Sequence, residues 1–208
     1  IGGAATWTGG TITGAAITTF SSTLDISGSG SKIISGGRTV NAHDNTWGGN
    51  TGAFNNDLFI NGGTFNNTGT FTDTNAFSDQ MLATGTFNNS GTYNKQNNTI
   101  TNIGTGVAFN NTGTVNVLTG GTLGVGSGGD WISTGKINET NATVVLNGDV
   151  TLPEINSITR SGGTIIIAGR FDNQRGTLKV GTGSTIGTIV LSGAIDNGSV
   201  NDASGGLG

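Results

Sequence analysis

A seven-residue phrase that returns every 22 residues constrains the fold of this chain more than any other feature. Its copies read F-N-N-T-G-T-F, F-N-N-S-G-T-Y and F-N-N-T-G-T-V, and a degenerate fourth reads W-I-S-T-G-K-I. They occupy residues 65–71, 87–93, 109–115 and 131–137. A fixed period of roughly 20 to 50 residues is typical of solenoids, propellers and other repeat arrays.

Repeat length and composition select among these arrays. A propeller blade needs about 40 residues, and a leucine-rich repeat needs a framework of leucine and asparagine that is absent here. Gly supplies 40 of the 208 residues, and Thr, Ile and Val are abundant, which disfavours helix and favours strand. We therefore predict an all-β fold, a single-stranded parallel β-helix with coils of about 20–25 residues. No shift in composition marks a boundary, so residues 1–208 are predicted to form one domain.

Stacking the sequence at this period aligns four columns, which we predict to form ladders along the solenoid axis. Successive coils lie about 4.8 Å apart, so the residues of one column sit on one another. The first column is aromatic and the second is large and mostly apolar, and we expect the aromatic column to point inward. The third comes from the asparagine pairs, whose amides can hydrogen-bond between coils, and the fourth is glycine, which tolerates the left-handed backbone of tight corners. The columns are Phe65, Phe87, Phe109 and Trp131; Phe71, Tyr93, Val115 and Ile137; Asn67, Asn89 and Asn111; and Gly69, Gly91, Gly113 and Gly135.

Two further expectations concern the outside of the solenoid. Asp73 and Lys95 fall in one column, so we expect an outward ion pair between adjacent coils, worth about 0.2–1 kcal/mol if exposed. Residues 41–50 interrupt the pattern most and are predicted to form a protruding loop. Residues 171–178 repeat the phrase with one insertion, so the same solenoid is expected to continue toward the end of the chain.

The alternation of F-N-N-x-G-T with a second phrase, Gly-Gly-Thr followed by an apolar residue, resembles the passenger regions of large bacterial exported proteins. The second phrase occurs at 9–12, 62–65, 120–123 and 162–165. The families concerned are the filamentous-haemagglutinin-like adhesins and the autotransporter passengers, and the resemblance covers most of residues 50–200. It implies a right-handed parallel β-helix, export through an outer-membrane partner, and a role in adhesion or cell-surface architecture.

Charge and apolar patterning argue against several other classes. The eight Lys and Arg residues are scattered singly, so no nucleic-acid partner is predicted. The longest apolar cluster, residues 165–168, is far shorter than the roughly 18 residues of a membrane-spanning helix, so no transmembrane segment is predicted. The chain contains no Cys, which rules out disulfides and thiolate metal sites, and no cofactor or metal is expected.

Parallel β-helices also carry polysaccharide-degrading enzymes, which need clustered carboxylates, commonly beside Arg or Lys. The densest such cluster is Arg38, His43 and Asp44, for which a solvated loop is the simpler interpretation. Residues 126–130, G-S-G-G-D, carry a fragment of a calcium-binding nonapeptide that does not recur, and we interpret them as a flexible corner. The several Asn-x-Ser/Thr triplets are mostly expected from composition alone.

We therefore expect a non-enzymatic extracellular solenoid, a shaft or adhesive segment of a bacterial surface or secreted protein. Two alternatives stay open: a carbohydrate-active β-helix enzyme (a polysaccharide lyase or glycosidase), and a self-assembling extracellular fibre or sheath subunit. Residues 1–10 and 201–208 carry a single charge, Asp202, and no recognisable cap for the strand edges. The expected partners are accordingly further coils of a longer chain or head-to-tail copies, besides a cell-surface receptor or glycan.

Overall fold

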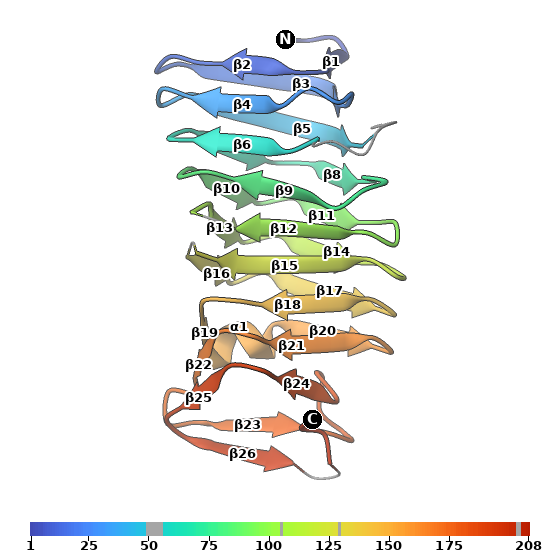
Figure 1. Ribbon diagram of the computed structural model, residues 1–208, viewed down its shortest axis with the longest axis vertical. Coiled ribbons are helices and arrows are strands. Elements are labelled where there is room, and N and C mark those ends of the chain that lie inside the picture. The colour runs from blue at the N-terminus through green and yellow to red at the C-terminus, as the bar shows by residue number, and fades with distance from the viewer. Residues whose placement is uncertain (49–55, 105, 129, 203–204) are drawn as a thin grey trace.

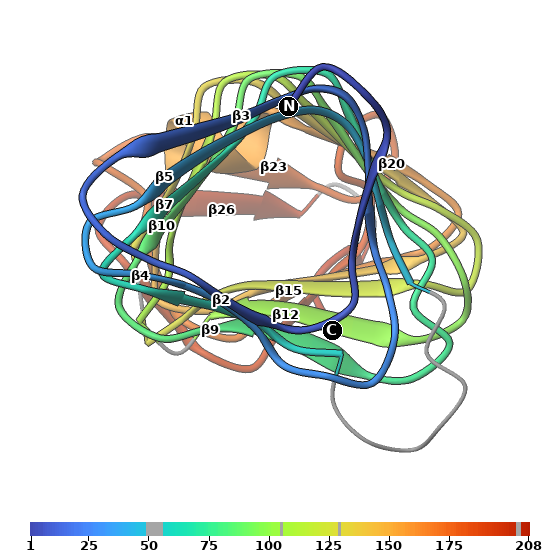
Figure 2. The same cartoon turned by 90° about the horizontal axis from the view of Figure 1, so that it is seen from above.

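The chain is wound into a parallel β-solenoid of about nine turns, as the computed structural model in Figure 1 shows for residues 1–48, 56–104, 106–128, 130–202 and 205–208. Every strand pair is parallel among the described residues, and successive turns superpose when viewed along the axis (Figure 2). The predictions of an all-β fold and of a parallel β-helix are confirmed.

In the central block each turn contributes one strand to each of three faces. Face one contains β7 (Thr64–Asn67), β10 (Thr86–Asn89), β13 (Ala108–Asn111) and β16 (Trp131–Ser133). Face two contains β8 (Thr70–Asp73), β11 (Thr92–Lys95), β14 (Thr114–Val117), β17 (Lys136–Thr140) and β20 (Ile158–Ser161). Face three contains β2 (Gly10–Ile12), β4 (Lys32–Ser35), β6 (Leu58–Asn61), β9 (Asp79–Leu82), β12 (Ile100–Gly104), β15 (Thr122–Ser127), β18 (Thr143–Leu146), β21 (Thr164–Ile167) and β24 (Ile189–Leu191).

The first turns join faces one and two through long strands. β3 (Ile17–Ile26) pairs with β1 (Ala5–Trp7) on one side and with β5 (Thr39–Trp47) on the other. β5 pairs with β7 through its first residues and with β8 through its last. The predicted loop over residues 41–50 is therefore wrong for 41–47, which lie in β5, whereas residues 49 and 50 lie outside the described residues. The strand forms because its inward residues, such as Val40 and Trp47, are apolar and fully buried.

The last turns depart from the three-face pattern. β19 (Asp149–Thr151), β22 (Arg170–Asp172) and β25 (Ala194–Asp196) form a separate three-stranded sheet, and β23 (Thr177–Val180) pairs with β26 (Ser199–Asp202). A short helix, α1 (Leu152–Asn156), fills the corner before β20. It begins at Thr151, whose N–H and hydroxyl both donate to Glu154 Oε2 at 2.8 Å, with Pro153 in the first turn.

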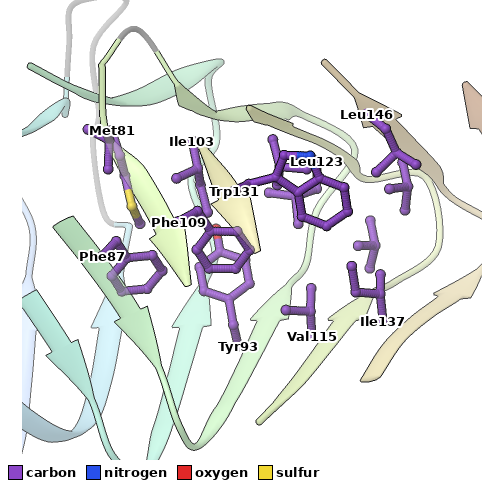
Figure 3. Close-up of a cluster of buried hydrophobic side chains, with 14 of the residues drawn as sticks. Met81, Phe87, Tyr93, Ile103, Phe109, Val115, Leu123, Trp131, Ile137 and Leu146 are labelled. Atoms are coloured by element: carbon purple, nitrogen blue, oxygen red, sulfur yellow. The ribbon is translucent and has the colours of Figure 1, made fainter. Parts of the chain in front are cut away.

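The core is one continuous column of apolar side chains supplied by all three faces. Successive residues of a strand point to opposite sides, so the phenylalanine of each repeat points inward. Phe87 stacks on Phe109 with ring centroids 5.6 Å apart, and Phe71 stacks on Tyr93 at 5.3 Å. Figure 3 shows this group together with Met81, which comes from face three. Such packing excludes water from the lumen along its length.

Removal of one ring from this column should destabilise the solenoid. Phe87 is fully buried and contacts aromatic rings on both neighbouring turns, so we expect Phe87→Ala to lower the free energy of unfolding by about 3–5 kcal/mol. Denaturant titration followed by circular dichroism measures this change. Phe77→Ala is the matched control, because Phe77 is 39% exposed and should cost far less. Equal losses in the two variants would contradict an inward aromatic column.

Candidate functional site

The side chains that the repeat brings together are the ladder residues, and the structure places each column in continuous register. Phe65, Phe87, Phe109 and Trp131 are successive pairing partners on face one. Phe71, Tyr93, Val115 and Ile137 are successive partners on face two. All eight side chains are buried. Both columns therefore line the lumen on the two sides of the same corner.

The second asparagine of each phrase forms a buried amide ladder. Asn67 Nδ2 donates to Asn89 Oδ1 at 2.7 Å, and Asn89 Nδ2 donates to Asn111 Oδ1 at 2.8 Å. Asn111 Nδ2 donates onward to Ser133 Oγ at 3.0 Å. Each of these amides also donates to a backbone carbonyl of the next turn, Thr92 in the case of Asn67. The inner ladder thus joins each corner to the one that follows.

The first asparagine of each phrase forms a second ladder on the outward side of face one. Asn110 Nδ2 donates to Asn88 Oδ1 and Asn88 Nδ2 to Asn66 Oδ1, both at 2.8 Å. Asn66 Nδ2 donates to Asn41 Oδ1 at 2.7 Å. These amide nitrogens belong to the Asn-x-Ser/Thr triplets of the repeat, so they are engaged within the fold.

The glycine of each phrase is required by close contact between corners rather than by a left-handed backbone. Gly69, Gly91, Gly113 and Gly135 are absent from the residues with positive φ. A Cβ atom added at Gly113 would lie 2.0 Å from the Gly91 carbonyl oxygen, and one at Gly135 would lie 2.0 Å from that of Gly113. The predicted reason for this column is therefore wrong: the corners stack too closely for any side chain.

A methyl group at this column should force neighbouring turns apart. We expect Gly113→Ala to destabilise the protein by about 1–3 kcal/mol or more, because the obstructing atom is backbone and cannot rotate away. Thermal unfolding followed by circular dichroism measures the loss. Gly3→Ala serves as the control, since nothing lies within 4 Å of a Cβ atom there. A Gly113→Ala protein as stable as this control would rule out the close contact.

Asp73 and Lys95 are fully buried, which corrects the prediction of an outward pair. Phe71 and Asp73 are two residues apart on β8, so both point into the lumen. Lys95 Nζ lies 3.5 Å from Asp73 Oδ1 and donates to Thr99 Oγ1 at 2.8 Å and to the Gln96 carbonyl at 3.0 Å. The energy of an exposed pair does not apply, because both charges have left water and depend on these contacts.

The carboxylate of Asp73 is surrounded by donors. Tyr93 Oη donates to Oδ2 at 2.8 Å, and Thr101 Oγ1 donates to the same oxygen at 2.6 Å. The backbone and side-chain nitrogens of Asn75 donate to Oδ1 at 3.2 and 3.1 Å. These contacts offset the desolvation of a charge that the lumen encloses.

A second group of buried polar side chains adjoins the first at the corner between faces two and three. Asn56 Nδ2 donates to Asn75 Oδ1 at 2.8 Å, and the Asn56 backbone N–H donates to Asp79 Oδ1 at 3.2 Å. Lys32 Nζ donates to the Gly28 carbonyl at 2.7 Å and to Asn56 Oδ1. We call the whole set the corner cluster, which comprises Lys32, Asn56, Asp57, Asp73, Asn75, Asp79, Tyr93, Lys95 and Thr101.

Burial dominates the electrostatics of the corner cluster. Desolvation raises the pKa of Asp79 to about 6 and also raises the pKa of Asp57. Desolvation lowers the pKa of Lys32, against the attraction of Asp79, and lowers the pKa of Lys95, against the attraction of Asp73. The cluster therefore holds two amines and two carboxyl groups whose neutral forms are favoured relative to water.

The raised pKa of Asp79 predicts a pH dependence with a definite sign. The folded state binds this proton more tightly than the unfolded chain, whose carboxyl titrates near 3.8. The stabilising contribution is therefore fully present below pH 3.8 and is lost as the pH rises through about 6. Carbon NMR of aspartate-labelled protein should show a carboxyl that titrates near pH 6 and disappears in Asp79→Asn. Titration near pH 4 would contradict the buried setting.

The predicted cluster of Arg38, His43 and Asp44 is only partly brought together. His43 Nδ1 lies 3.2 Å from Asp44 Oδ2, and both side chains are more than half exposed. Arg38 donates instead to the Thr13 carbonyl on the neighbouring turn, at 2.5 Å from Nη2. His43 and Asp44 lie where the pairing of β3 and β5 shifts register, so the two side chains turn outward there.

The calcium-like fragment lies beside an open depression. Gly126, Gly128 and Asp130 line it together with Gly148 and Asp149, and its volume is about 290 Å³. Gly129 lies outside the described residues. Across the described ranges, no three His, Asp or Glu side chains are grouped so as to hold a metal ion. The depression thus offers two carboxylates and backbone groups.

Comparison with protein-family models, with curated proteins and with solved structures finds no match. No helix among the described residues is long and apolar enough to cross a membrane. The β-solenoid fold and the contacts above are therefore the basis for inferring function.

Proposed function

We propose that this protein is a non-enzymatic extracellular solenoid, a stiff shaft or adhesive segment of a bacterial surface or secreted protein. The observation that supports this most is the continuity of its ladders. The backbone pairing, the aromatic column and the amide ladders all run along one axis through consecutive turns. A solenoid of this kind is stabilised by contacts between neighbouring turns, so it can extend without needing a wider core.

On this proposal the partners are further coils of a longer chain, head-to-tail copies, or a receptor or glycan at a cell surface. The outward positions of the central block favour such a passive surface, because Thr and Asn predominate there, as in T-F-N-N and T-V-N-V. A self-assembling fibre subunit is a variant of the same function, in which the repeated contact is end to end.

The carbohydrate-active alternative has one observation in its favour. Asp130 and Asp149 both line the open depression beside face one, and glycoside hydrolysis uses a pair of carboxylates. A purified protein that releases reducing ends from polysaccharides, and loses this activity in Asp130→Asn with Asp149→Asn, would favour the enzyme. His43→Ala with Asp44→Ala is the matched control for loss of exposed acid–base groups.

We expect the shaft to resist extension and then to uncoil turn by turn. Pulling between the two ends in a single-molecule force experiment should give steps of about 70–80 Å, because a turn of 22 residues extends at roughly 3.3–3.6 Å per residue. Phe87→Ala should lower the force of the steps around that turn. Antibody labelling of intact producing cells tests the location. A single global rupture, or protein found only inside cells, would count against the proposal.

A further inference from the structure

Lys32 and Asn56 meet inside the lumen as a primary amine and a carboxamide, with a carboxyl group beside them. Lys32 lies at the start of β4, and Asn56 lies 24 residues later, just before β6 on the next turn. Both side chains are fully buried, and Lys32 Nζ is in hydrogen-bonding contact with Asn56 Oδ1. We propose that Lys32 and Asn56 condense into an intramolecular isopeptide bond, with the Asp79 carboxyl group carrying the protons.

The environment of Asn56 fixes how its amide meets the amine. Its Nδ2 donates to Asn75 Oδ1 at 2.8 Å and to the Gly48 carbonyl at 3.3 Å, which leaves Oδ1 facing Lys32. Its backbone carbonyl accepts from Trp47 Nε1 at 2.8 Å. The carbonyl carbon is about 1.2 Å from Oδ1, so an amine in contact with that oxygen is positioned for attack with little further movement.

Asp79 is placed to serve this reaction. Its Oδ1 accepts the backbone N–H of Asn56 at 3.2 Å, and among the acidic residues that attract the Lys32 charge it has the largest effect, ahead of Asp25 and Asp57. Attack requires a neutral amine and is helped by a protonated acid. Burial lowers the pKa of Lys32 and raises that of Asp79 to about 6, so both neutral forms are favoured here relative to water.

The chemistry balances without an oxidant or a cofactor. The lone pair of Lys32 Nζ forms a bond to Asn56 Cγ, and Oδ1 takes the proton of the Asp79 acid. The Asp79 carboxylate then accepts a proton from Nζ and passes it to Nδ2. As the carbonyl re-forms, the Cγ–Nδ2 bond breaks and ammonia leaves, so the products are one secondary amide, one ammonia molecule and an unchanged Asp79.

The other buried lysine shows the contrast within the same molecule. Lys95 Nζ faces the Asp73 carboxylate, the Thr99 hydroxyl and the Gln96 carbonyl, which together stabilise an ammonium ion. None of these three acceptors is a side-chain carboxamide. Lys95 is therefore expected to keep a free amine, and it serves as an internal control for Lys32.

Mass spectrometry of the intact and trypsin-digested protein tests the bond. Loss of ammonia should make the folded protein lighter than its sequence by about 17 Da. Trypsin should not cut after the modified Lys32, so residues 1–38 should appear joined to residues 39–95 in one branched peptide, whereas cleavage after Lys95 proceeds. A cyclised asparagine loses the same mass without joining two peptides, so the branched peptide is decisive. Free peptides 1–32 and 33–38 as the main products from folded protein would overturn the proposal.

Three variants assign the roles of the residues. Lys32→Met keeps the length and volume of the side chain without the amine, and should show the full sequence mass and no branched peptide. Asp79→Asn should also retain the full mass, whereas Asp57→Asn, which alters the neighbouring buried carboxyl, should still form the bond. A branched peptide in Asp79→Asn would overturn the role of Asp79. The wild-type mass decides whether the bond exists, even if a variant fails to fold.

Discussion

The stacking of each corner on the corner below is the contact on which the rest of the structure depends. Gly91, Gly113 and Gly135 each bring a backbone carbonyl to where a side chain would begin, so the turns can approach only in one register. This register aligns the aromatic rings and brings the amides within hydrogen-bonding distance. A shift of one residue along the chain would turn every inward phenylalanine outward. The corner glycines therefore specify the core even though they contribute no side chain to it.

Much of this arrangement is readable from the repeat, because a solenoid places like residues on one another. The 22-residue spacing predicts the pairing of Phe65 with Phe87, and that pairing is what the structure shows. The position of Asp73 could also have been deduced, since it shares the parity of Phe71 along β8. Its charge suggested an outward position, but the alternation of the strand determines the side on which it lies.

The corner cluster could not be found by stacking the sequence, because its members do not repeat. Lys32, Asn56 and Asp79 come from three successive turns of face three, and the turns there differ in length. Ile33 pairs with Phe59, 26 residues later, whereas Leu58 pairs with Met81, 23 residues later. A periodic ladder cannot hold turns of unequal length in register. Specific polar contacts between single residues take over that role here, and they are invisible to a search for periodicity.

The two asparagine ladders of face one run in opposite directions. In the inner ladder Asn67 donates toward the C-terminal end of the chain, and its second bond, to the Thr92 carbonyl, fixes that orientation. In the outer ladder Asn88 donates toward the N-terminal end. Aligned amides add their dipoles, as the peptide units of a helix do. Because these two rows oppose each other, lengthening the solenoid adds little net moment along face one, and turns can be added without a growing charge separation between the ends.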